Sequence, residues 1–375
     1  MRAINSSVMK THNRRLVLDL IRHRPISRAE LAEQTSLTRA SITQIVDELM
    51  QEGLVAETAL VGRNHLGRRM TQLALVKDAR YLLGLNIGRF EYDLGIINLS
   101  GEVLHHSTGT VAERETGEVL DEVCRLIEEK IEELHLPRER ISGIGICAPG
   151  PLDVKNGIIL NPPNFEKWHN VPIVQEVRRR LNYSTVLENI SNAHALDEMY
   201  FGIGKQGVEN FLLLRVDEGV GAGVILQNRL FTSSNGQGPE LGHITIFADG
   251  PKCACGNRGC LEQYIAFPAI LRDTPFSTWR QLMDQHDSGP ARTLLLQLTE
   301  MLSDLAVNII NLFDLEKIVL SGHFHYRGEI LSAMLNERIC GRTLHMDDGC
   351  RVVASEKIEI PRIAAMPVYH SMFSM

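Results

Sequence analysis

The chain has 375 residues, of which 44% are hydrophobic and 23% charged, a composition typical of a globular protein with two or three domains. Its apolar runs fall short of the roughly 20 residues that cross a bilayer, and its first residues lack the apolar core of a signal peptide. These features exclude a membrane-spanning class and predict a cytoplasmic protein without a membrane partner. The seven cysteines, an odd number, argue against a disulfide framework.

The net charge of −7 is unevenly distributed along the chain. Residues 1–78 contain 12 Lys and Arg against 8 Asp and Glu, a net charge of +4, so the remainder carries −11. A basic N-terminal segment joined to an acidic remainder is expected when only one end of a protein meets DNA phosphates.

The N-terminal segment begins with two predicted helices. The first covers roughly residues 11–22, after which Pro25 breaks the pattern. Ser27 is a candidate N-cap for the second helix, residues 28–34, because Glu30 stands three residues later and completes a capping box.

A third helix is predicted after a tight turn at residues 35–37, with Thr38 as its cap and Gly53 at its end. Its apolar residues recur with helical spacing and mark one buried face: Ile42, Ile45, Val46 and Leu49. Two short helices joined by a tight turn and preceded by a packing helix predict a helix-turn-helix.

Two alternating segments follow, residues 54–57 and 71–75, and predict a β-hairpin with a basic, glycine-bearing connection over residues 62–69. This connection is typical of a wing whose arginines enter a minor groove. We therefore predict a winged helix-turn-helix over residues 1–78. Its predicted DNA contacts are Ser27, Thr38, Arg39, Ser41, Thr43, Arg63, Arg68 and Arg69. The alternative is a small helical domain that serves oligomerisation and whose arginines are merely solvated.

The rest of the chain predicts an α/β body of two similar lobes separated by a cleft, because antiparallel strands followed by helices occur twice. We expect the first lobe over residues 79–195 and the second over 196–375, with the C-terminal part as a candidate to return to the first lobe. An apolar helix is expected near the C-terminus, and Pro367 is predicted to interrupt it.

Three cysteines lie close together in a glycine-bearing loop, at Cys253, Cys255 and Cys260. Three thiolates and one further ligand bind a tetrahedral zinc ion, and His243 stands ten residues upstream, within reach. Four protein ligands close the coordination shell, so the predicted Zn²⁺ is structural. The alternative is a cluster of buried free thiols.

The pattern E-x-G-H at residues 240–243, followed by C-x-C-G-x-x-G-C-x-E at residues 253–262, resembles the ROK family of repressors, open reading frames and sugar kinases. The helix-turn-helix is similar to that of the repressor branch. The resemblance implies an actin/hexokinase-like fold for the body, zinc in the sugar-binding lobe and a sugar in the cleft. It assigns the sugar contacts to Asn164, Asn189, Glu240, His243 and Glu262. Amides and carboxylates suit adjacent hydroxyls, each of which is both a donor and an acceptor.

Three departures from the family kinases bear on function. Asn86 stands where the kinases have the Asp of a D-x-G-x-T turn that handles phosphate and magnesium. Ile190 replaces the Asp of E-N-D-x-N, the base toward the sugar hydroxyl, and cannot accept a proton. The glycine cluster on the adenosine side is altered at residues 321–325. We therefore predict a protein that is not an enzyme.

The loss of the Asp at position 190 also predicts an unusual ligand, either a 6-deoxy or otherwise less polar sugar or a sugar that already carries a phosphate. The alternative is weak sugar binding or drift to another ligand. The sequence as a whole predicts a sugar-responsive repressor of carbohydrate genes, acting as a homodimer or homotetramer on operator DNA. Two further alternatives are a ROK kinase that phosphorylates a hexose with ATP, and a repressor that another protein controls.

Overall fold

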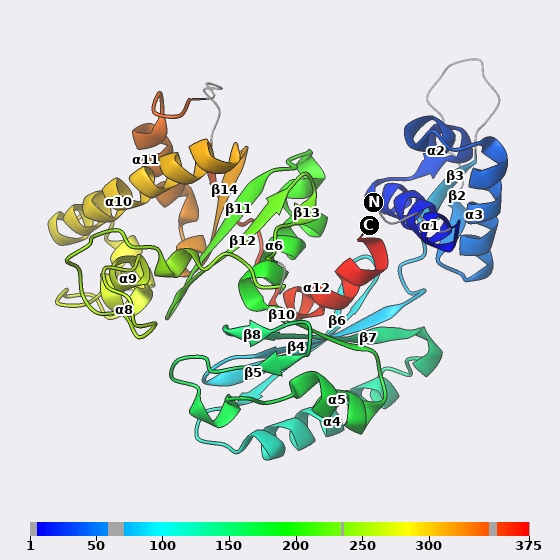
Figure 1. Ribbon diagram of the computed structural model, residues 1–375, viewed down its shortest axis with the longest axis horizontal. Helices are drawn as coiled ribbons and strands as arrows, with labels where there is room; N and C mark the ends of the chain where they lie inside the picture. Colours follow the sequence, from blue (N-terminus) through cyan, green and yellow to red (C-terminus); the bar gives the residue numbers. More distant parts are fainter. Residues whose placement is uncertain (1–5, 59–70, 234–235, 345–350, 375) are drawn as a thin grey trace.

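The computed structural model describes residues 6–58, 71–233, 236–344 and 351–374. It has a small N-terminal head and a larger body of two α/β lobes, and the C-terminal helix lies between the head and the lobes (Figure 1). This architecture confirms the predicted fold class.

The described part of the head contains three helices and a small sheet with the strand order β1-β3-β2. Its elements are α1 (Ser6–His23), β1 (Ile26–Ser27), α2 (Arg28–Thr35), α3 (Arg39–Gln51), β2 (Val55–Thr58) and β3 (Gln72–Leu75). Ser36 adopts a left-handed conformation with φ of 56°, and this conformation ends α2 and makes the tight turn before Thr38 caps α3. The predicted helices and hairpin strands are thus present, while the connection over residues 62–69 lies outside the described residues.

Both lobes are built on five-stranded sheets of the same topology. The first sheet has the order β10-β7-β4-β5-β6 and the second the order β13-β12-β11-β14-β15. In the first sheet β7 pairs in parallel with β4 and with β10, and in the second β14 pairs in parallel with β11 and with β15. The first sheet consists of β4 (Tyr81–Ile87), β5 (Glu91–Asn98), β6 (Val103–Thr110), β7 (Ile141–Ala148) and β10 (Thr185–Asn189). The second consists of β11 (Phe211–Val216), β12 (Val220–Leu226), β13 (Arg229–Leu230), β14 (Lys317–Gly322) and β15 (Val352–Ala354).

Helices cover these sheets and connect the lobes. The first lobe carries α4 (Thr116–Glu133), α5 (Ile173–Leu181) and the short hairpin β8 (Leu152–Asp153) and β9 (Ile158–Ile159). The second carries α7 (Glu262–Ile265), α8 (Phe267–Ile270), α9 (Trp279–Asp284), α10 (Gly289–Phe313) and α11 (Gly328–Ile339). Helix α6 (Ile190–Phe201) runs across the predicted boundary at residue 195, so one continuous helix links the two lobes.

Helix α12 (Ile360–Phe373) corrects the expectation for the C-terminus, because it continues through Pro367 without a break. It packs on β4, β5 and β7 of the first lobe. Three glycines in neighbouring strands, Gly84, Gly95 and Gly145, allow this close approach, since a Cβ on any of them would lie within 2.6 Å of an α12 atom. Packing against this glycine surface compensates for the backbone hydrogen bond that proline removes.

Among the described helices, α10 is the one that is long and apolar enough to cross a membrane by length and composition. More than half of its apolar window is buried inside the structure. Leu295, Leu302 and Ile309 of this helix belong to the hydrophobic core of the second lobe. The apolar face of α10 is therefore a packing face within the body.

Candidate functional site

The outer face of α3 is exposed at its N-terminal end. Arg39 and Thr43 are exposed, and the side chain of Arg39 has no partner among the described residues. Thr38 accepts a hydrogen bond from the backbone N–H of Ser41 at 3.1 Å, so it caps the helix while lying on the exposed surface. An uncommitted arginine at the start of the second helix of a helix-turn-helix is the arrangement that meets base edges or phosphates.

Ser27 is a correction to the predicted DNA contacts. It is only 3% exposed, and its side chain accepts from the backbone N–H of Glu30 and donates to the Glu30 carboxylate in the capping box. These bonds and its burial leave it inside the head. The remaining predicted contacts, Arg63, Arg68 and Arg69, lie outside the described residues.

The predicted metal ligands come together. One potential ligand atom from each of His243, Cys253, Cys255 and Cys260 lies within 4.8 Å of all the others. The Cys253 sulfur is 3.7 Å from Nδ1 of His243, and the Cys255 and Cys260 sulfurs are 3.7 Å apart. Tetrahedral zinc with Zn–S bonds of about 2.3 Å requires sulfurs about 3.8 Å apart, so the donor set and its spacing fit zinc.

Tight turns hold the ligand loop in this shape. Gly256 and Gly259 adopt positive φ values of 94° and 63°, which glycine tolerates without strain. A Cβ at Gly259 would lie 1.7 Å from the carbonyl oxygen of Phe247, so no larger residue fits there. The sequence predicted this cluster correctly because its ligands lie within 18 residues of one another.

Glu240 and Glu262, two predicted sugar contacts of the second lobe, lie near each other. Oε2 of Glu262 accepts the backbone N–H of Val220 at 3.1 Å, which leaves its other oxygen available. Burial raises the pKa of Glu240, the charge of His243 opposes this change, and the nearby Glu262 carboxylate adds to it. The three side chains therefore lie close enough to affect one another electrostatically.

Asn189 of the first lobe faces this group. A Cβ built on Gly150 would lie 3.2 Å from Nδ2 of Asn189 and 3.6 Å from Oε1 of Glu240, so Gly150 separates an amide of one lobe from a carboxylate of the other. Oδ1 of Asn189 accepts the backbone N–H of Ser191 at 2.8 Å, while Nδ2 has no acceptor among the described residues. Asn164 is exposed in another loop of the first lobe, and no hydrogen bond among the described residues joins it to the other four.

Behind Asn189 lies a buried carboxylate that the sequence did not single out for a role. Burial raises the pKa of Glu188 to about 7, although hydrogen bonds from Asn192 and from the backbone of Asn189 oppose this shift. The only available signal was its place in the motif beside Asn189. Glu188 holds the start of α6 in position from inside the protein.

At the predicted phosphate turn, Nδ2 of Asn86 donates to Oδ2 of Asp93 at 3.1 Å, and the other oxygen of Asp93 lies 3.1 Å from Nε2 of His106. Nε of Arg89 donates to the carbonyl oxygen of Pro163 at 3.0 Å. Asn86 and the nearby Arg89 are therefore both engaged in bonds within the first lobe.

An ion-paired group lies at the ends of β11 and β14, beside the altered glycine cluster of residues 321–325. Burial would raise the pKa of Asp217, but Arg215 and His323 outweigh it and the pKa falls to about 2. The Asp217 carboxylate lies 2.5 Å from Arg215 and 2.7 Å from Nδ1 of His323. Phe267 packs on the His323 ring with centroids 4.4 Å apart. Arg215 and His323 therefore keep this carboxylate ionised and neutralise its charge.

The known proteins that this chain is similar to differ in how much of it they match. The xylose repressor of Caldicellulosiruptor bescii is 30% identical over 365 residues, covering 90% of both chains. The glucokinase of Thermotoga maritima is 31% identical and spans 93% of its own length but 74% of this chain. A crystal structure of a ROK family transcriptional regulator, described as a homolog of the Escherichia coli MLC protein, superposes with a TM-score of 0.82 at 27% identity and covers 97% of both chains.

The repressor and the transcriptional regulator thus match nearly the whole chain, whereas the glucokinase leaves about a quarter of it unmatched. The sequence model of the ROK family matches residues 82–350, which make up most of the body. The chain belongs to the ROK family.

Proposed function

We propose that this protein is a sugar-responsive transcriptional regulator, a repressor of carbohydrate genes that binds operator DNA through its head and a sugar through its body. The observation that carries the proposal is the exposed N-terminal end of α3, with Arg39 unpaired among the described residues, on a head joined to a body in which Asn189, Glu240 and Glu262 lie close together. The similarity to repressors over head and body supports it.

The regulator acts in the cytoplasm as a homodimer or homotetramer, because two heads related by a two-fold axis match the two halves of a palindromic operator. Thr38, Arg39, Ser41 and Thr43 of the described head contact the major groove, and the wing arginines Arg63, Arg68 and Arg69 contact the minor groove. The sugar changes DNA affinity only if it binds one state of the protein more tightly than the other.

The body binds sugar without phosphorylating it. Asn86 and Arg89 are engaged in hydrogen bonds within the first lobe, and Ile190 has no proton acceptor. The chain thus lacks the carboxylate that handles phosphate and magnesium and the base that accepts the proton of the sugar hydroxyl, both of which phosphoryl transfer requires.

A structural zinc ion bound by His243, Cys253, Cys255 and Cys260 orders the second lobe. With Nδ1 of His243 turned toward Cys253, its Nε2 is left for a sugar hydroxyl, so the metal fixes the orientation of a ligand contact. Asn164, Asn189, Glu240 and Glu262 complete the proposed sugar contacts.

The charges of the site favour a neutral sugar over a sugar phosphate. Glu240 and Glu262 face the proposed ligand position and Glu188 lies behind Asn189, while Arg215 is already paired with Asp217. A sugar without the hydroxyl that kinases phosphorylate needs no acceptor at position 190. Xylose, the sugar after which the Caldicellulosiruptor relative is named, is a pentose and has no such group.

The proposal is tested with purified full-length protein and duplex DNA enriched from a random pool by binding to it. Operator affinity is measured without ligand and with xylose, glucose, 6-deoxyglucose, N-acetylglucosamine and glucose 6-phosphate. We expect a neutral sugar without the 6-hydroxyl to change the operator Kd by about 5- to 150-fold. ATP consumption with the same sugars is expected to stay at background.

Two arginine variants provide the matched comparison. Arg39→Ala is expected to raise the operator Kd by about 5- to 150-fold, whereas Arg125→Ala, which removes an exposed α4 arginine paired with Glu129, leaves it unchanged. Failure to enrich any DNA would refute the regulator proposal, and sugar-dependent ATP consumption would favour the kinase alternative.

Ile190 provides the test of ligand class. We expect Ile190→Asp to shift the preference toward sugars that carry a free 6-hydroxyl, because the new carboxylate accepts a hydrogen bond from that group. Ile190→Val, which keeps an apolar side chain in this buried position, serves as the control. Sugar Kd values for glucose and 6-deoxyglucose are compared by calorimetry, and an unchanged ratio in Ile190→Asp would contradict the assignment.

A further inference from the structure

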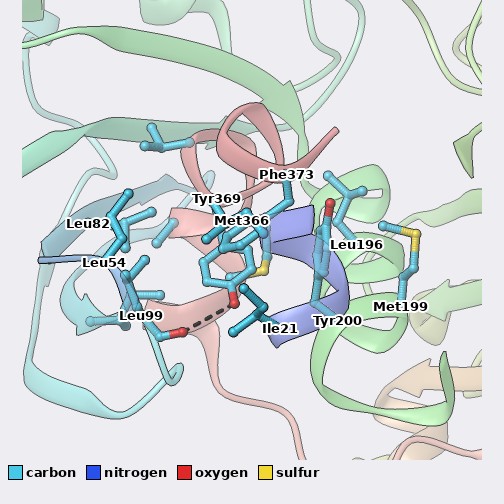
Figure 2. Packing of buried hydrophobic residues seen from close by; sticks show 14 of the residues in the cluster. Ile21, Leu54, Leu82, Leu99, Leu196, Met199, Tyr200, Met366, Tyr369 and Phe373 are labelled. Carbon is cyan, nitrogen blue, oxygen red and sulfur yellow. Dashed lines mark hydrogen bonds between the residues drawn. The ribbon is translucent and has the colours of Figure 1, made fainter. Parts of the chain in front are cut away.

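The head and the body share one hydrophobic core. The cluster contains Val17, Leu18 and Ile21 of α1 together with residues of α6 and α12. Figure 2 shows Ile21 of the head beside Tyr369 and Tyr200 of the body. Apolar burial between the parts makes the position of the head sensitive to movement of the helices beneath it.

Helix α6 connects the proposed sugar site to this shared core. Asn189, a proposed sugar contact, is its N-cap, and the helix continues for 12 residues to Phe201. At 1.5 Å per residue its length is about 18 Å. Every residue from Ile190 to Tyr200 is buried, so α6 is packed along its length rather than free to bend into solvent.

The C-terminal end of α6 meets the head at Arg22. Nη1 of Arg22 donates to the carbonyl oxygen of Tyr200 at 3.3 Å, and the guanidinium lies 4.6 Å from the centre of the Tyr200 ring and 5.7 Å from that of Phe373. Nε of Arg22 donates to Asp19 at 2.9 Å. The Arg22 side chain is only 6% exposed, which makes it a buried cation at the joint between head and body.

Two acidic side chains of α6 accept hydrogen bonds from residues outside this helix. Asp197 accepts two hydrogen bonds from Arg362 of α12, at 2.6 and 2.9 Å. Glu198 accepts a hydrogen bond from Ser355, which follows β15 of the second lobe. A displacement of α6 is therefore passed to α12, and α12 itself packs against α1 of the head.

We propose that α6 carries the ligand signal from Asn189 to the head, and that Arg22 is the positioning residue that receives it. This inference rests on the proposed function. A sugar that binds the amide of Asn189 biases the position of the N-terminal end of α6, and the packed helix moves as a unit. The Tyr200 carbonyl and ring then shift under Arg22, which changes the orientation of the head relative to its partner on the operator.

The experiment compares Arg22→Gln with Arg14→Gln in the full-length protein. Arg14 also lies on α1, but its ion pair is with Glu52, within the head. For each protein, calorimetry gives the xylose Kd without DNA, and fluorescence anisotropy gives the operator Kd with and without saturating xylose, or with whichever sugar of the panel shifts the wild type.

We expect Arg22→Gln to bind the sugar within about twofold of the wild type while its sugar-induced change in operator Kd falls from the about 5- to 150-fold of a coupled system to under about twofold. Arg14→Gln is expected to keep the full change. A full response in Arg22→Gln, or an equal loss in Arg14→Gln, overturns the role of Arg22. A wild type whose operator Kd no sugar changes overturns the proposed function itself, and the inference with it.

Hydrogen exchange on the wild type provides a second measurement that requires no variant. Addition of the sugar is expected to change the exchange of amides in residues 196–201 of α6 and 18–23 of α1, and to leave those of α4 unchanged. If exchange changed only around the sugar contacts and not at either end of the joint, α6 would not be the connection.

Discussion

Asn86 donates a side-chain hydrogen bond to Asp93, its register partner on the adjacent strand, with Nδ2 and Oδ2 3.1 Å apart. Family kinases have a carboxylate at position 86, and in this chain such a carboxylate would face another one. The amide is thus matched to its neighbour across the β4–β5 pair. The loss of the phosphate-handling group is accommodated by the sheet itself.

Asn86→Asp should therefore destabilise the protein rather than restore a kinase. Two facing carboxylates raise the pKa of one of them in the folded state, so the loss of stability is small below about pH 4 and grows as the pH rises through that folded pKa. We expect a loss of about 1–3 kcal/mol at pH 7, measured by urea denaturation at several pH values. ATP consumption is expected to remain at background.

The control for this prediction exchanges the two side chains. The double variant Asn86→Asp with Asp93→Asn restores one amide and one carboxylate in the same pair, and it should recover most of the stability that Asn86→Asp loses. A double variant as unstable as the single one would show that the charge repulsion is not the cause.

The metal site predicts a dependence of stability on zinc. Cys255 is exposed, so Cys255→Ser removes a ligand with little loss of packing. We expect about one zinc per chain in the wild type by atomic absorption, loss of zinc in Cys255→Ser, and a Tm about 5–10 °C lower. A chelator should lower the Tm of the wild type toward that of the variant.

Cys340→Ser is the matched control, because Cys340 is also an exposed free thiol but lies outside the cluster. It should keep the zinc content and Tm of the wild type. A wild type without zinc would favour the alternative of a cluster of free thiols, and a Cys255→Ser variant that keeps its zinc would contradict the role of Cys255 as a ligand.

Glu188 predicts a pH dependence with a definite sign. Its pKa is about 7 in the folded state against an ordinary value of 4.5, because burial disfavours the charged form. A carboxyl whose folded pKa is raised contributes less stability as the pH rises from 4.5 through 7, by up to about 3 kcal/mol. Glu188→Gln keeps the acceptor for Asn189 and Asn192 but cannot ionise, so its stability relative to the wild type should increase over this range.

The comparison with the wild type isolates Glu188 from two buried histidines. Burial lowers the pKa of His194 to about 3 and that of His370 to about 4, so their contributions are lost as the pH falls below 6.5. The wild type and Glu188→Gln contain both histidines, so the histidine contributions cancel in the difference between their free energies of unfolding. Parallel stability profiles of Glu188→Gln and the wild type, from urea denaturation between pH 4.5 and 8, would contradict the raised pKa.

The parts of the fold that the sequence predicted are those specified by neighbouring residues. The capping box of Ser27 and Glu30 and the spacing of apolar residues in α3 are signals within one or two helical turns. The metal cluster likewise lies within one stretch of 18 residues. In such segments the sequence contains both partners of each interaction at short range.

The features that were missed depend on partners far apart in the chain. Arg22 meets Tyr200 across 178 residues, and the only local hint was its position three residues after Asp19 beside an apolar helix face. Pro367 predicted a break because it removes a backbone donor. The helix continues because it packs on distant glycines and because the Cys147 thiol lies 4.0 Å from the Ile363 carbonyl, which would otherwise accept from residue 367.

The glycine surface under α12 predicts a large effect from a very small substitution. A Cβ at Gly84 would lie 2.6 Å from the backbone nitrogen of Ala365 and 2.7 Å from the carbonyl oxygen of Pro361, so Gly84→Ala forces α12 away from the sheet. Overpacking of this kind costs about 1–3 kcal/mol, measured by urea denaturation. Gly117→Ala on α4, where a Cβ meets nothing within 4 Å, should be neutral or stabilising by up to about 1 kcal/mol. Because α12 also contacts α1, Gly84→Ala should also weaken the packing of the head, which faster amide exchange in α1 would show. Equal stability of the Gly84→Ala and Gly117→Ala variants would refute the close packing of α12 on the sheet.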